Sequence, residues 1–96
     1  MSMSKGAYRQ KAEAKIEEGQ AKLKEARAKA KGASADARLD AEKHIDNLEK
    51  KLDAAKKKLA DMGDAAEDAW QDLTKDLDDT WDDISGGITK ILARFK

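Results

Sequence analysis

Apolar residues in the C-terminal third of the chain recur at intervals of eleven. The repeat units are KLADMGDAAED, AWQDLTKDLDD and TWDDISGGITK, followed by the partial unit ILARFK. Their apolar positions form three columns: Leu59, Trp70, Trp81 and Leu92; Met62, Leu73, Ile84 and Phe95; Ala66, Leu77 and Ile88. Eleven residues make three helical turns at about 3.67 residues per turn, so each column stays on one face of a helix. The pattern predicts an amphipathic helix whose apolar stripe needs a partner.

The stripe continues upstream with a different spacing. Ile45, Leu48, Leu52, Ala55, Leu59 and Met62 follow one another in alternating steps of three and four residues, as in a coiled coil. Before residue 42 the positions in step are mostly alanine, which favours helix but buries little surface. We predict three segments: an Ala-rich basic helix over 1–33, a heptad helix over 34–62, and an acidic eleven-residue-repeat helix with a short basic tail over 63–96.

Glycines mark the places where the helix can break. Gly32 is suited to follow a helix end, and Ser34 can cap the next helix, so we place any bend near Gly32 to Ser34. At Gly63 the columns keep their phase, which predicts a kink in a continuous helix there.

Two further sequence signals concern helix ends. Asp64 and Glu67 have the spacing of a capping box, with Asp in place of the usual Ser or Thr. The Gly86-Gly87 pair is expected to loosen the last turns of the C-terminal helix, because glycine is a poor helix former.

Composition favours an elongated or oligomeric molecule. The 96 residues include no Pro, no Cys and only four aromatic residues, whereas 42% are charged. This profile is typical of a long helix or coiled coil, and the absence of cysteine excludes disulfides and thiol chemistry. We therefore predict an all-α fold of long amphipathic helices that form a coiled coil, assembled as a homo-oligomer.

Charge is divided unevenly along a chain whose net charge is zero. Residues 1–58 hold 16 basic and 10 acidic residues, whereas residues 59–85 hold one Lys and 10 acidic residues. Opposed blocks favour pairing of the basic with the acidic part, in an antiparallel hairpin or between chains. An uneven but solvated surface is the alternative interpretation.

The chemistry-bearing residues form no recognisable catalytic constellation. His44 has no nucleophile at a recognisable spacing, and the serines lie in no nucleophile motif. The aspartates of residues 76–83 could bind a divalent cation through oxygen, but they do not fit an EF-hand loop, and a solvated acidic face is the better interpretation. Specific nucleic-acid binding is not expected, because acids interrupt the basic half and only Tyr8 could stack on a base. The sequence thus predicts no catalytic residue, metal site, cofactor or small-molecule substrate.

The two tryptophans are interpreted as packing residues. Trp70 and Trp81 could be interfacial anchors or ligand-stacking platforms, but they share a column with leucines, which favours a helix–helix seam. The predicted seam consists of Ile45, Leu48, Leu52, Leu59, Met62, Trp70, Leu73, Leu77, Trp81, Ile84, Ile88, Leu92 and Phe95.

Several of these features resemble a family of small bacterial coiled-coil proteins known as stress-response proteins. The resemblance covers most of the chain and rests on Tyr8, the Ala-Asp-Ala segment at 35–37, the heptads over 45–59, and the units AWQDL at 69–73 and WDDI at 81–84. The alanine-rich first third and the Ser-Gly-Gly at 85–87 depart from the family. The resemblance implies a cytoplasmic helical protein linked to stress, without established catalytic residues.

Two functions follow as hypotheses. The first is a non-catalytic, self-associating coiled coil. The second is a peripheral protectant of lipid surfaces that orders on binding, through a tail over 88–96 that is apolar at Ile88, Ile91, Leu92 and Phe95 and basic at Lys90, Arg94 and Lys96. The N-terminus lacks the apolar core of a secretory signal, and no window approaches a membrane span, so a cytoplasmic location is expected.

Overall fold

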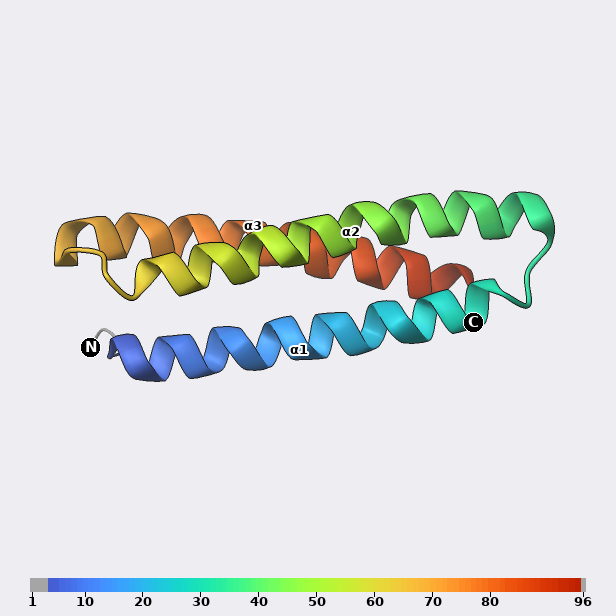
Figure 1. Cartoon of the computed structure of the whole chain (residues 1–96). Coiled ribbons are helices and arrows are strands. Elements are labelled where there is room, and N and C mark those ends of the chain that lie inside the picture. The colour runs from blue at the N-terminus through green and yellow to red at the C-terminus, as the bar shows by residue number, and fades with distance from the viewer. Residues whose placement is uncertain (1–3, 96) are drawn as a thin grey trace.

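The chain folds into three α helices that lie side by side. The computed structural model describes residues 4–95, in which α1 (Lys5–Ala30), α2 (Ala35–Met62) and α3 (Glu67–Arg94) follow one another and no strand occurs. α1 and α3 run in the same direction along the bundle and α2 runs in the opposite direction between them in sequence (Figure 1). The bundle measures 49 × 18 × 16 Å. The prediction of an all-α fold of long helices is confirmed.

The turn between α1 and α2 lies at the predicted position, near Gly32 to Ser34. Beyond the end of α1, the N–H groups of Gly32 and Ala33 donate to the carbonyls of Lys29 and Ala30, at 3.2 and 3.0 Å. Ser34 then caps α2, its Oγ accepting a hydrogen bond from the Ala37 N–H at 3.4 Å. Backbone bonds and a side-chain cap together satisfy groups that the helix ends leave unpaired.

The second turn corrects the prediction of a continuous C-terminal helix. α2 ends at Met62, residues 63–66 reverse the chain, and α3 begins at Glu67. Each helix directs its own apolar columns into one shared core, and periodicity alone cannot distinguish this hairpin from a straight helix. The predicted capping box is also wrong: Ala66 occupies the N-cap position of α3 and makes no side-chain cap bond, whereas Asp64 lies within the turn.

The glycines in the helices allow close packing. Gly86 and Gly87 do not end α3, which continues to Arg94. A Cβ on Gly87 would lie 2.8 Å from Leu48 Cδ2 of α2, whereas a Cβ on Gly86 would meet nothing within 4 Å. Gly87 therefore lets α3 approach α2, and Gly86 faces outward.

The core receives unequal contributions from the three helices. In α1 only Ile16 and Leu23 are both buried and larger than alanine. The buried residues of α2 are Ala41, Ile45, Leu48, Leu52, Ala55, Leu59 and Met62, and those of α3 are Trp70, Leu77, Ile84, Ile88 and Ile91. The bundle is therefore built on the α2–α3 pair, which the alanine-rich face of α1 covers.

The adjacent glycines of α3 provide a stability test. Gly86→Ala should raise the free energy of unfolding by about 0.5–1 kcal/mol, because alanine favours helix and the new methyl group is unobstructed. Gly87→Ala gains the same propensity but crowds Leu48, so it should be about 1–3 kcal/mol less stable than Gly86→Ala. Urea unfolding of both variants measures the difference. Equal stabilities would contradict the close approach at Gly87.

Candidate functional site

The structure brings the predicted seam residues together inside one chain. Nine of them are buried: Ile45, Leu48, Leu52, Leu59, Met62, Trp70, Leu77, Ile84 and Ile88. The other four are partly buried and pack against that core: Leu73, Trp81, Leu92 and Phe95. The surface predicted to join helices is therefore the core of the three-helix bundle.

The predicted seam omitted apolar residues that the core contains. Ile16 and Leu23 of α1 are buried, and the weak periodicity before residue 42 is the signal that could have included them. Ile91 is buried whereas Leu92 is only partly covered. In the last turns the residues that face the core are 84, 88, 91 and 95. The eleven-residue column therefore selects Leu92, the neighbour of the buried Ile91.

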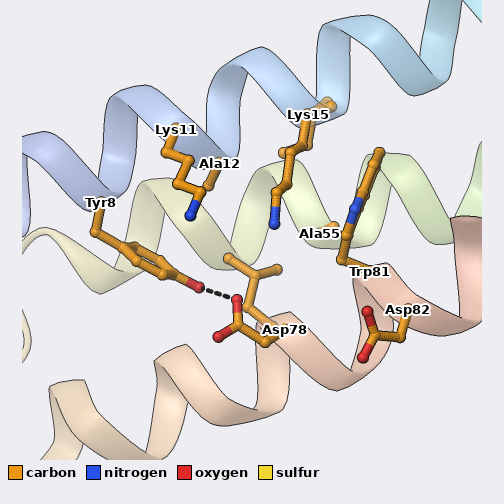
Figure 2. Close-up of a pocket in the computed structure, with 10 residues that line it drawn as sticks. Tyr8, Lys11, Ala12, Lys15, Ala55, Asp78, Trp81 and Asp82 are labelled. Atoms are coloured by element: carbon orange, nitrogen blue, oxygen red, sulfur yellow. Dashed lines mark hydrogen bonds between the residues drawn. The ribbon is translucent and has the colours of Figure 1, made fainter. Parts of the chain in front are cut away.

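A groove of about 430 Å³ runs between α1 and α3. Its apolar surface includes Ile16 and Leu77, and the rings of Tyr8 and Trp81 stand near its two ends (Figure 2). α1 packs less extensively on α3 than on α2, and the small side chains of α1 leave this space uncovered. The volume lies within the range of small-molecule pockets, but the groove is open along one side.

The two walls of the groove carry opposite charges. Lys11 and Lys15 extend from α1 toward α3, and Asp78 and Asp82 stand on the opposite wall (Figure 2). Over their full lengths, α1 holds eight basic and four acidic residues, whereas α3 holds three basic and eight acidic residues.

Tyr8 joins α1 to α3 at one end of the groove. Its hydroxyl oxygen lies 2.9 Å from Asp78 Oδ1 and 3.2 Å from the Thr74 carbonyl oxygen, so its single proton is donated between two acceptors. Desolvation raises the pKa of Tyr8, and the hydrogen bond to the negatively charged Asp78 raises it further. The hydroxyl is therefore held in its neutral, donating form.

Trp70 is enclosed beside this contact. The Tyr8 ring meets its ring edge-on, with centroids 5.5 Å apart and planes at 78°, and the Lys5 ammonium lies 5.4 Å from the Trp70 ring centroid. Both arrangements suit the charge distribution of an aromatic ring. With 7% of its surface exposed, Trp70 is a core residue and offers no open face to a ligand. Trp81, which is partly exposed in the groove wall, is the tryptophan that a ligand could reach.

Ion pairs connect the basic parts of the chain with the acidic helix in an antiparallel hairpin. Lys51 contacts Asp83 at 2.6 Å and Lys58 contacts Asp76, so α2 is tied to α3 at two levels. The Lys51 ammonium lowers the pKa of Asp83 through its hydrogen bond and its charge. Because these side chains are exposed, each pair adds little stability, but together they favour the acidic helix as the neighbour of α2.

The other chemistry-bearing residues are dispersed. The His44 ring is about half exposed, with its Nε2 3.7 Å from Asp40 Oδ1, away from the groove between α1 and α3. Within residues 4–95, no three His, Cys, Asp or Glu side chains are grouped closely enough to hold a metal ion. None of the three helices is long and apolar enough to span a membrane.

No family model matches the chain, and comparisons with curated proteins and with solved structures give no significant match. The resemblance to stress-response coiled-coil proteins therefore rests on the residues of the chain alone.

Removing the Tyr8 hydroxyl should weaken the contact between α1 and α3. Tyr8→Phe should lower the free energy of unfolding by about 1 kcal/mol at pH 7, because Asp78 and Thr74 lose a hydrogen-bond donor. Since folding raises this pKa above its ordinary value of 10.0, the stabilisation is fully present below pH 10 and is lost as the pH rises above it. The deficit of Tyr8→Phe relative to the wild type should shrink in alkaline buffer.

The measurement is chemical unfolding of both proteins between pH 7 and pH 11. Asp79→Asn, one residue beyond the acceptor, is the control and should change stability by less than about 0.5 kcal/mol. A deficit that stays constant over this pH range would show that the hydroxyl makes no such contact.

Proposed function

We propose that the protein acts without catalysis, as a self-associating coiled-coil protein of the cytoplasm in a role linked to stress. The observation that carries this proposal is the phase of the apolar columns on either side of the second turn. Leu59 and Trp70 are eleven residues apart across that turn, as are Met62 and Leu73. A hairpin does not need this spacing, whereas a helix that pairs with a second copy does. The paired tryptophan units support the link to stress through the family they resemble.

Self-association should appear as a mass that depends on concentration. Sedimentation velocity should show the 10.5 kDa chain at micromolar concentration and a species of twice that mass as the concentration approaches about 1 mM. Helicity by circular dichroism should change little, because both forms are helical.

The dependence of the dimer on salt concentration distinguishes association through an apolar seam from association through ion pairs. α1 is basic and α3 is acidic, so copies held together by these exposed faces would separate as NaCl rises to about 1 M, whereas an apolar seam persists. A monomer at every concentration, or a dimer that vanishes in high salt, would contradict the proposal.

Binding to a lipid surface is the second candidate, favoured by one end of the bundle. Leu39 is 60% exposed, the largest exposure of a large apolar side chain among the described residues. The 2.7 Å ion pair between Arg94 and Asp40 places the end of α3 beside it, where Phe95 is partly exposed. Together with Lys90, these residues combine apolar and basic groups, as surface-binding helices do.

This candidate predicts selective binding to anionic vesicles. Leu39→Ser with Lys90→Gln should lower the affinity for phosphatidylserine vesicles about tenfold, because one apolar anchor and one charge are lost. Ala21→Ser with Lys24→Gln, on the exposed face of α1, makes the same change of charge elsewhere and should leave the affinity within about twofold. Flotation of vesicles with bound protein measures both. Equal losses in the two variants, or no binding by the wild type, would remove this candidate.

A further inference from the structure

We infer that two copies of the chain exchange α3: the turn at residues 63–66 opens into helix, and each α3 packs in the bundle of the other copy. The inference rests on the proposed self-association and specifies its partner and geometry. Each bundle of the dimer then contains α1 and α2 from one copy and α3 from the other.

The turn between α2 and α3 lacks the local features that would fix it. Gly63 already has helical angles, φ −57° and ψ −30°, and no residue among those described has a positive φ. Ala66, at the N-cap, makes no side-chain cap bond. One backbone hydrogen bond, from the Ala65 N–H to the Met62 carbonyl, and one from Lys5 Nζ to the Ala65 carbonyl hold the turn. Apart from Gly63, its residues need no special conformation and are tolerated in a helix.

The other turn is fixed much more strongly. Between α1 and α2, the N–H groups of Lys31, Gly32 and Ala33 all donate to carbonyls of α1, and Ser34 caps α2 with its side chain. Opening that turn into helix would keep the Lys31 bond, which already has helical spacing, but would break the bonds of Gly32 and Ala33 and the Ser34 cap. Exchange is therefore expected at the second turn and not at the first.

The apolar pattern of the sequence also fits a helix that continues through the second turn. Residues 35–94 would then form one helix of about 90 Å, at 1.5 Å per residue. Its columns would run without interruption, from Leu59 to Trp70 and from Met62 to Leu73. Ala66, which is exposed in the hairpin, falls in the column of Leu77 and would join the seam. Two such helices from two copies lie antiparallel and cross at this point.

Exchange keeps the contacts of the bundle and makes some of them intermolecular. Lys58 of one copy meets Asp76 of the other, and Gly87 of one receives Leu48 of the other, as they do now within one chain. Contacts between α1 and α2, such as Arg27 with Glu49, stay within one copy. Little packing energy separates the two forms, so the conformation of the turn decides between them.

Proline at matched positions tests which turn opens. Ala66 and Ser34 precede the first residues of α3 and α2 and are extended, with ψ 160° and 158°, so Glu67→Pro and Ala35→Pro both fit the hairpin form. Inside a continuous helix, proline removes a hydrogen bond and clashes. Glu67→Pro should lower the dimerisation constant at least 100-fold, whereas Ala35→Pro should leave it within about threefold. Glu67→Ala controls for the lost charge.

The opposite change should promote exchange. A Cβ on Gly63 would lie 3.4 Å from Arg9 Nη1 and 3.6 Å from the Ala60 carbonyl oxygen, ordinary contacts that the monomer accommodates. Gly63→Ala should therefore raise the dimerisation constant only about two- to threefold: Gly63 already has helical angles in the hairpin, so both forms share most of the gain in helix propensity.

Chemical cross-linking shows directly whether α3 has been exchanged. The chain has no cysteine, so Lys58→Cys with Asp76→Cys places the only two thiols at positions where α2 and α3 meet. A short bismaleimide added at the concentration where sedimentation shows the dimer should give a covalent dimer on a denaturing gel. Arg27→Cys with Glu49→Cys joins α1 to α2 and should give a monomer with an internal cross-link in either case.

The outcomes separate this inference from the proposal on which it rests. If the wild type and Gly63→Ala stay monomeric at all concentrations, self-association fails and exchange fails with it. If a dimer forms but Glu67→Pro dimerises equally, or the 58–76 cross-link stays within one chain, exchange is overturned and self-association stands. The cross-link uses a chain with both turns unchanged, so it decides the question even if a proline variant does not fold.

Discussion

The packing of α3 against α2 is the contact on which the rest of the structure depends. These two helices supply nearly all of the large buried side chains, and Gly87 lets Leu48 come close enough to join them tightly. Burying these side chains is the main favourable term in folding. α1 has only Ile16 and Leu23 to add, so its position follows from the surface that α2 and α3 present. The groove beside Trp81 stays open because the narrow apolar face of α1 does not cover the whole of the wider apolar surface that α2 and α3 form.

Charge then decides how these apolar faces are aligned. Lys51 with Asp83 and Lys58 with Asp76 lie along the outer edge of the α2–α3 contact, where water weakens each pair. A shift of α3 by one turn would set Lys51 against Asp79 and Lys58 against Asp72, so unlike charges would still meet, but it would move Leu48 away from Gly87. The apolar stripe therefore supplies the free energy of association, the charges favour α3 as the neighbour of α2, and the glycine selects one alignment.

The sequence predicted which faces are buried and where the first turn lies, because both are local. Periodicity identifies an apolar face from side chains a few residues apart, and Ser34 indicates a helix start because its own hydroxyl can cap the helix. The second turn was missed because the columns, which have the same phase in a hairpin and in a straight helix, outweighed the signals of Gly63 and of the Asp64 and Glu67 spacing. The role of Gly87 and the groove beside Trp81 depend on residues from other helices, and no local pattern contains that information. The groove is therefore the part of the candidate site that only the tertiary structure reveals.

The same ambiguity is a physical property of the chain. In the proposed exchange, an apolar stripe in unbroken phase would be satisfied by the α3 of its own chain or of another, so concentration and the turn would select the partner. A short turn holds α3 at an effective concentration of about 1 mM or more, which favours the hairpin in dilute solution. A second copy would compete only as the protein concentration approaches that value. Loss of cell water raises the concentration of every protein at once, so a chain built in this way would shift from monomer to assembly under such stress without any ligand or chemical modification.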